Sequence, residues 1–252
     1  MKKRFFVVGA LIGALLLLLI MYGFAQRGGS PAEQGSPITI ETGTTTGAII
    51  EQVPIEKYAG EPITNICSDR VLKMLPSDRR GEFPEELKKL SRTLRASPYD
   101  TESWLRVGNV KHYLDCYEGA RDAWEYVLYL SPESVAAAEN LGSLYTTDIQ
   151  NFPLAEKYYR IAIRNNSKDI AAYLGLAEVD RIQKKSDQAI TVLKEGLAAV
   201  PNDFSLTVTL GQTYEERGDR TQALVHYEKA LALEPQNAEL KAVIEKLKAA
   251  KS

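Results

Sequence analysis

Small residues recur at a nearly fixed interval in the second half of this chain. Gly108 is followed by Gly142 after 34 residues, then by Ala177 after 35 and by Gly211 after another 34. Each copy also has an alanine 12 or 13 residues beyond its small residue. A period of this length indicates stacked copies of one supersecondary unit, because a single unit of this size cannot bury its apolar face alone.

Aromatic, small and proline residues keep the same order around each of these positions. The first copy has Trp104, Val107, Gly108, Ala120, Trp124, Val127 and Pro132, and the second has Leu141, Gly142, Tyr145, Ala155, Tyr159 and Ala162. The third has Tyr173, Leu176, Ala177, Ala189, Leu193 and Pro201, and the fourth has Leu210, Gly211, Tyr214, Ala223, Tyr227, Ala230 and Pro235. This order and this period resemble the tetratricopeptide repeat (TPR) family.

The resemblance implies an all-α fold, a right-handed TPR superhelix (α-solenoid) of about four helix-turn-helix repeats. We expect the repeats at residues 101–134, 135–169, 170–203 and 204–237. Residues 61–100 form a lead-in with a half-repeat capping helix over 84–96, and residues 238–252 form a C-terminal capping helix. In the third repeat Lys184, Lys185 and Ser186 stand where Gly218 closes the turn of the fourth, so we expect a looser turn there.

The first 25 residues predict a transmembrane helix before the solenoid. Lys2, Lys3 and Arg4 precede a run without charge from Phe5 to Phe24. Such a run is about 30 Å long as a helix, which matches the hydrocarbon core of a bilayer. Basic residues before the run predict a cytoplasmic N-terminus, hence a single-pass protein of the cell membrane with extracytoplasmic repeats. The alternative is a cleaved signal segment and a secreted protein.

Residues 26–60 predict a flexible linker, because they are rich in glycine, proline and threonine and lack helical periodicity. Gly9 and Gly13 form a GxxxG pair within the apolar run. Such a pair lets two membrane helices approach closely, so a homodimer through these two residues is a further hypothesis.

Charge and motifs exclude several classes of function. The 252 residues include 31 Lys and Arg against 33 Asp and Glu, and this near-neutral balance argues against nucleic acid as a partner. No phosphate-binding loop, nucleophile elbow or HExxH pattern occurs, so we expect no enzyme, no catalytic residue and no cofactor. His112 and Cys116 have helical spacing for two metal ligands, but no ligand cluster accompanies them, so we expect no metal site.

The two cysteines, Cys67 and Cys116, leave their pairing open. A disulfide suits an oxidising compartment but needs Cα atoms within about 7 Å. If Cys67 opens a decayed first helix, it lies at the opposite end of the stack from the turn at Cys116.

In TPR proteins, the same few positions of the first helix of each repeat face a concave groove. The residues that we expect to contact a partner there are Glu102, Leu105, Asn109, His112, Tyr113, Glu139, Ser143, Leu174, Glu178, Arg181, Val208, Gln212 and Glu215. TPR members that clamp the C-terminal carboxylate of heat-shock chaperones carry basic residues here. Asn109 fits that pattern, whereas Ser143 and Glu178 do not.

The predicted groove is apolar and acidic, which suits an extended or helical protein segment with apolar anchors and basic flanks. A second candidate hot spot is the tyrosine-rich first repeat, with Tyr113, Tyr117, Tyr126 and Tyr129. We therefore expect a membrane-tethered, extracytoplasmic scaffold that binds a protein or peptide and assists envelope, secretion or pilus assembly. The alternatives are a self-associating structural component of an envelope machine and a secreted, soluble TPR module.

Overall fold

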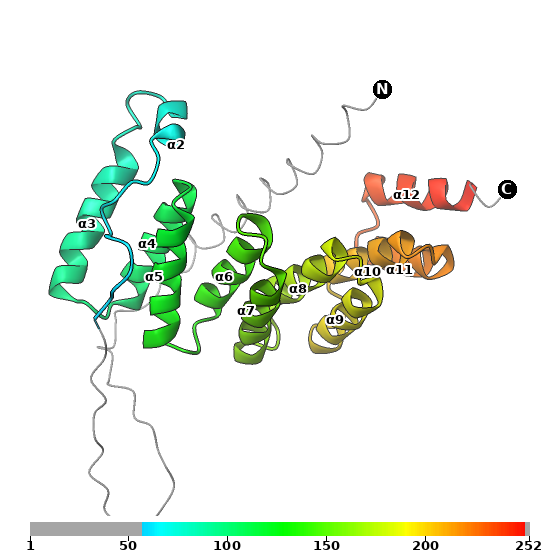
Figure 1. Cartoon of the computed structure of the whole chain (residues 1–252). Helices are drawn as coiled ribbons and strands as arrows, with labels where there is room; N and C mark the ends of the chain where they lie inside the picture. Colours follow the sequence, from blue (N-terminus) through cyan, green and yellow to red (C-terminus); the bar gives the residue numbers. More distant parts are fainter. Residues whose placement is uncertain (1–56, 250–252) are drawn as a thin grey trace, which may run out of the picture. The chain divides into compact units, whose positions relative to one another are not determined.

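Helices make up most of the structure, a computed structural model that describes residues 57–249 (Figure 1). In chain order they are α2 (Arg70–Met74), α3 (Glu82–Ala96), α4 (Thr101–Tyr113), α5 (Tyr117–Leu130), α6 (Val135–Thr147), α7 (Phe152–Asn165), α8 (Ile170–Ile182), α9 (Ser186–Ala199), α10 (Phe204–Glu216), α11 (Arg220–Leu233) and α12 (Ala238–Ala249).

The helices from α4 to α11 form four hairpins, in which α4 packs on α5, α6 on α7, α8 on α9 and α10 on α11. The second helix of each hairpin also packs on the first helix of the next one, so the hairpins stack side by side (Figure 1). At the two ends of the stack, α3 packs on α4 and α12 packs on α11. The predicted all-helical solenoid is confirmed.

The predicted fold class needs one correction, because it placed a transmembrane helix before the solenoid. Among residues 57–249, no helix has both the length and the apolar character that a membrane span requires. The segment predicted to span the membrane (1–25), most of the predicted linker, and Gly9 and Gly13 lie outside the described residues. The fold that the structure supports is therefore the helical solenoid alone.

The two helices of a hairpin approach most closely at the recurring small residue. A methyl group added to Gly142 would lie 2.8 Å from ring carbons of Tyr159, and one added to Gly211 would lie 2.8 Å from the ring of Tyr227. In the third repeat the ring is replaced by Leu193, and there the small residue is Ala177, which is fully buried. Glycine therefore stands on the first helix where an aromatic ring stands on the second.

Each hairpin turns at one residue in the left-handed conformation. The φ angles are +59° at Asp115, +56° at Gln150, +60° at Lys184 and +86° at Gly218. In the third turn the N–H of Lys184 donates to the carbonyl oxygen of Arg181 at 2.9 Å, the same length as the corresponding bond of Gly218. The expectation of a looser third turn was wrong, because a lysine can adopt this conformation for about 1–2 kcal/mol.

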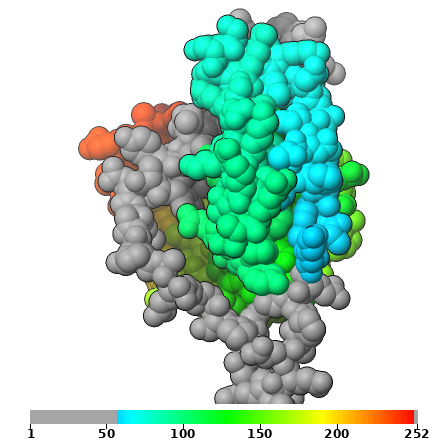
Figure 2. Space-filling view, turned by 90° about the vertical axis from the view of Figure 1, so that its left-hand side faces the viewer, coloured from blue at the N-terminus to red at the C-terminus, as the bar shows by residue number. Residues whose placement is uncertain are grey.

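The lead-in segment, defined here as residues 57–69, is not a helix (Figure 1). Its light-blue surface is visible in Figure 2. It lies against the first hairpin, where the ring of Tyr58 packs on Trp104 and Tyr126 with centroid distances of 4.3 and 5.3 Å. The peptide N–H of Glu61 donates to the carboxylate of Asp122 at 3.0 Å. These contacts fix the lead-in segment along α4 and α5.

A buried lysine on α4 holds the middle of the lead-in segment. Lys111 is 0% exposed, and its Nζ donates to the carbonyl oxygens of Pro62 at 2.8 Å and Asn65 at 2.9 Å. The carboxylate of Glu61 lies 3.4 Å from the same atom. Burial lowers the pKa of Lys111, and the charge of Glu61 opposes that change only in part.

The lead-in segment is also joined to the first hairpin by a disulfide between Cys67 and Cys116, whose Cα atoms are 5.4 Å apart. The sequence left this pairing open, because Cys67 would lie at the far end of the stack if it opened a decayed helix. It does not open a helix, since α2 begins only at Arg70 and Cys67 lies in an irregular segment along the hairpin.

Replacing Lys111 with methionine should destabilise the protein by about 3 kcal/mol, because two buried carbonyl groups and the carboxylate of Glu61 lose their donor. Urea denaturation of the full chain measures this change. The matched control is Lys246→Met on α12, where the side chain is exposed and the change should stay within about 0.5 kcal/mol. A loss below 1 kcal/mol for Lys111→Met would contradict the role given to this lysine.

Replacing Gly142 with alanine should destabilise the protein by about 1–3 kcal/mol, since the new methyl group overlaps the ring of Tyr159. Gly81 is the control, because no atom lies within 4 Å of a methyl group placed there. We expect Gly81→Ala to change the free energy of unfolding by less than about 1 kcal/mol, and thermal and urea unfolding compare the two variants. Equal effects at both positions would show that the ring does not limit the helix approach.

Candidate functional site

The concave side of the stack is formed by the first helices. Helix α8 contacts both α6 and α10, whereas neighbouring second helices make at most marginal contact with one another. The spacing between repeats is therefore smaller on the side of the first helices, and the stack curves toward that side. We call the surface of α4, α6, α8 and α10 on this side the groove.

All thirteen predicted groove residues reach the surface of the solenoid. Seven are exposed: Glu102, Asn109, Tyr113, Ser143, Glu178, Gln212 and Glu215. Six are half-buried: Leu105, His112, Glu139, Leu174, Arg181 and Val208. Contact with a partner stays a prediction for each of them.

Arg181 links the third and fourth repeats across the groove. Its guanidinium donates to Glu178 on the same helix at 2.6 Å and to Glu216 on α10 at 2.9 Å, with a second bond to the other oxygen of Glu216. The hydrogen bond to Glu216 raises the pKa of Arg181, so the arginine stays charged. One basic side chain is thus shared between two acidic ones.

A cavity of about 560 Å³ opens beside this network. Its lining residues come from α8, from the turn after it, from the start of α9 and from the end of α10. They are Glu178, Arg181, Ile182, Lys184, Ser186 and Glu216. The side chain of Ile182 is 45% exposed and supplies the aliphatic part of the lining. The cavity therefore combines an apolar side chain with two carboxylates and two basic side chains.

Glu139 on α6 adds an acidic group with unusual protonation. Burial, with a smaller contribution from the negative charge of Asp169, raises its pKa to about 8. Asp169 is itself held in place as the N-cap of α8, where its carboxylate accepts from the N–H of Ala172 at 3.1 Å. At neutral pH, Glu139 consequently carries a proton that it can donate.

Glu215 is oriented by a tyrosine of the same repeat. The hydroxyl of Tyr227 donates to its carboxylate at 2.8 Å, and burial raises the pKa of Tyr227 above its usual range. Glu215 and its neighbours Glu178 and Glu216 outnumber Arg181 in this half of the groove. The surface of α8 and α10 is therefore net acidic.

At the first repeat, His112 joins α4 to the end of α6. Its Nε2 lies 2.9 Å from the carboxylate of Asp148, and its ring centroid lies 5.6 Å from that of Trp124. Burial alone would raise the pKa of Asp148, but hydrogen bonds from His112 and Thr147 outweigh it and lower the pKa. Cys116 is in the disulfide, and residues 57–249 contain no group of three or more potential metal ligands.

The tyrosines of the first repeat do not form one patch. Tyr113 is 49% exposed and stacks on Phe83 at 4.5 Å between centroids, whereas Tyr126 is only 8% exposed. Tyr129, at 44% exposure, lies on α5, a second helix, and Tyr117 is half-buried.

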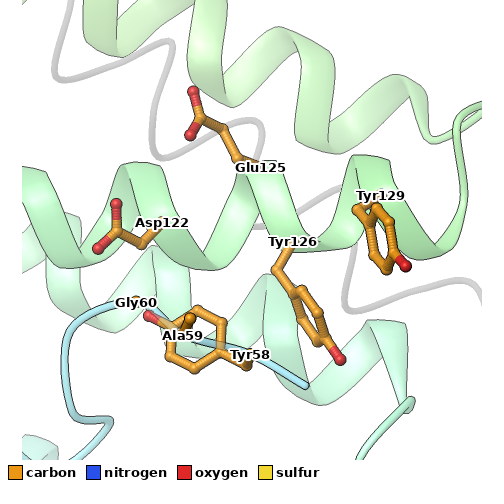
Figure 3. A pocket seen from close by; sticks show the side chains of 7 residues that line it. All are labelled: Tyr58, Ala59, Gly60, Asp122, Glu125, Tyr126 and Tyr129. Carbon is orange, nitrogen blue, oxygen red and sulfur yellow. The ribbon is translucent and has the colours of Figure 1, made fainter. Parts of the chain in front are cut away.

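A pocket of about 250 Å³ lies between α5 and the lead-in segment, away from the groove (Figure 3). It is lined by Tyr58, Ala59, Gly60, Asp122, Glu125, Tyr126 and Tyr129. Tyr126 projects from α5 toward Tyr58, whereas Glu125 points away from it.

Two groove-side acids were not among the residues expected from the sequence. Asp148 directly follows α6, and Asp169 directly precedes α8. An aspartate just before a helix is a visible N-cap signal, so Asp169 was recognisable as a cap. Its effect on Glu139 depends on the packing of α6 against α8, which no local pattern predicts.

Comparison with known proteins identifies the repeats. Residues 208–237 and residues 147–204 each match a family model described as a tetratricopeptide repeat. The chain carries tetratricopeptide repeats. These matches cover the second half of repeat two through repeat four, the part of the solenoid that holds the cavity and the network of Arg181.

The curated relatives are much longer proteins. The cellulose synthase operon protein C of Escherichia coli K12 is 27% identical over 176 residues, which cover 69% of this chain and 14% of that protein. Anaphase-promoting complex subunit 7 of Arabidopsis thaliana is 26% identical over 145 residues, which cover 58% of this chain and 25% of that protein. This chain thus spans a minor part of each relative.

Solved structures share the fold. A crystal structure of MamA aligns with a TM-score of 0.55 at 23% identity, covering 64% of this chain and 95% of MamA. MamA from Desulfovibrio magneticus RS-1 aligns with a TM-score of 0.54 at 22% identity, covering 64% and 90%. At this identity the similarity concerns the fold alone.

Replacing Glu139 with glutamine should change how stability depends on pH. The pKa of this carboxyl is about 4.5 in the unfolded chain and about 8 in the folded protein. The folded protein therefore becomes less stable as pH rises from 4.5 toward 8, because the unfolded chain releases the proton first. Glutamine does not titrate, so the variant does not lose this stability. The difference in the free energy of unfolding between variant and wild type should shift in favour of the variant by about 1–3 kcal/mol from pH 5 to pH 8. Urea unfolding across this range measures the gain, and parallel curves for the two proteins would contradict it.

Proposed function

We propose that the groove binds a segment of another protein and that this chain is a non-enzymatic interaction scaffold. The observation that carries the proposal is the open cavity at α8 and α10, where the exposed Ile182 lies beside Glu178 and Glu216. A concave pocket with an apolar wall and a few convergent polar groups is the default candidate for a binding site.

The chemistry of the groove selects the kind of segment. Leu174 and Val208 are half-buried on the groove side and can contact apolar anchors. The carboxylates around Arg181 favour a lysine or arginine next to such an anchor, because a basic side chain can pair with Glu178 or Glu216. We propose an extended or helical segment with alternating apolar and basic residues.

The same proposal places the scaffold in an oxidising, extracytoplasmic compartment. The disulfide between Cys67 and Cys116 supports this placement, since disulfides are rare in reducing compartments. We further propose a part in building a larger assembly, such as an envelope, secretion or pilus machine. The names of two relatives, an operon protein for cellulose synthase and a complex subunit, support a role beside other proteins.

Selection of peptides from a random library on the purified full chain tests the groove. We expect the selected peptides to combine apolar and basic residues. Glu178→Gln combined with Glu216→Gln should then weaken their binding at least about tenfold, or 1.4 kcal/mol, because the pairing carboxylates are gone. Fluorescence anisotropy with labelled peptides measures the affinity.

The control for this test is Glu195→Gln, which removes an exposed carboxylate from α9, a second helix. Its affinity for the peptides should equal that of the wild type. If the groove variant binds as tightly as the control, the bound segment lies elsewhere and the proposal fails.

A further inference from the structure

We propose that the disulfide between Cys67 and Cys116 is a thiol–disulfide exchange site. A dithiol reductant attacks Cys67, Cys116 leaves, and the lead-in segment is released from the first hairpin. This inference concerns the outer side of the first repeat and does not depend on the groove.

The two sulfurs differ in access. Cys67 lies in an exposed position of the lead-in segment, whereas Cys116 is 1% exposed at the start of α5. Exchange requires the attacking sulfur to reach the disulfide in line with the bond that breaks, so the exposed sulfur is the one attacked. Access alone therefore makes Cys67 the electrophile.

The surroundings of Cys116 favour it as the leaving group. Cys116 is the N-cap of α5, where the free N–H groups of the helix stabilise negative charge. The peptide N–H of Cys67 also points at the sulfur of Cys116, at 2.9 Å. This hydrogen bond, together with the positive end of the helix dipole, stabilises a thiolate on Cys116 at the moment the disulfide breaks.

The surroundings of Cys67 have the opposite effect. The carboxylate oxygens of Glu61 lie 3.4 and 3.7 Å from its sulfur. A negative carboxylate disfavours a thiolate on Cys67 but accepts a hydrogen bond from its thiol. The disulfide is thus polarised, with Cys116 leaving first and Cys67 ending as a protonated thiol that donates to Glu61.

The reaction is balanced with a dithiol as the reductant. Its thiolate forms a new S–S bond with Cys67, and the electron pair of the broken bond moves to Cys116, which takes a proton. The second thiol of the reductant then attacks the mixed disulfide, and Cys67 leaves and is protonated. Two electrons and two protons pass to the protein, and the reductant becomes a disulfide.

Reduction removes the covalent part of a two-part attachment. The hydrogen bonds of Lys111 to Pro62 and Asn65 remain, as does the packing of Tyr58 on Trp104, but these contacts can open reversibly. Opening exposes the otherwise fully buried Lys111 and the aromatic face of Trp104 and Tyr126. The disulfide therefore decides whether this face is covered.

Glutathione, used as a monothiol probe on the oxidised full chain, tests which sulfur is attacked and which one leaves. The sample is quenched with acid, the freed thiol is alkylated, and mass spectrometry of peptides locates both groups. We expect glutathione on Cys67 and the alkyl group on Cys116, in at least about tenfold excess over the reverse pattern. Equal amounts, the reverse pattern or a protein without the disulfide would overturn the proposal.

Hydrogen exchange tests the release. Dithiothreitol without denaturant should reduce the disulfide and raise amide exchange in the lead-in segment at least about tenfold, while α6 to α11 keep their protection. Cys67→Ser, which cannot form the bond, should show the same local pattern without reductant. Reduction that needs denaturant, or exchange that rises through the whole solenoid, would mark a purely structural disulfide.

Discussion

The contact between a small residue on one helix and a ring on the next governs this structure. Gly108 lies so close to Trp124 that an added methyl group would be 2.2 Å from the indole nitrogen, and Gly142 and Gly211 meet tyrosine rings in the same way. The Nε1 of Trp124 is buried without a hydrogen-bond partner in the part of the chain described, so packing rather than polarity fixes that ring. Because the two helices of each hairpin pack closely, the hairpins have similar shapes and can stack.

Stacking then creates the groove, because contacts are closer between first helices than between second helices. Curvature collects residues from α6, α8 and α10 that are far apart in the sequence. Arg181 and Glu216 meet in this way across 35 residues, and Glu139 meets Asp169 across the same kind of interface. The electrostatics of the groove therefore arises between repeats and not within them.

One position of the repeat holds different types of residue in the four copies. Lys111, Tyr145, Asp180 and Tyr214 occupy equivalent places, and all four are buried. Tyr214 stacks on His226 and Tyr145 on Tyr158, whereas Lys111 binds carbonyl groups of the lead-in segment. Burial raises the pKa of Asp180, the remaining member of the set. The repeat fold fixes where these side chains lie, and the neighbouring residues determine which interactions they make.

The sequence by itself determined the repeating hairpins, since the spacing of small, aromatic and proline residues is a local pattern that every stacked copy must satisfy. The residues expected in the groove came instead from the resemblance to tetratricopeptide repeats, and their contact with a partner stays a prediction. The transmembrane helix that the sequence predicted ahead of the solenoid is not part of the fold that the structure describes.

Only the tertiary structure decided the path of the lead-in segment, the pairing of Cys67 with Cys116 and the protonation of Glu139. Each depends on contacts between segments far apart in the chain, 49 residues in the case of the disulfide. The repeat register places Lys111 at a buried position, but no local pattern shows that its acceptors come from the lead-in segment. A local sequence pattern specifies the helical hairpin. The pairing and protonation of its side chains depend on burial and charge from residues that are distant in the chain.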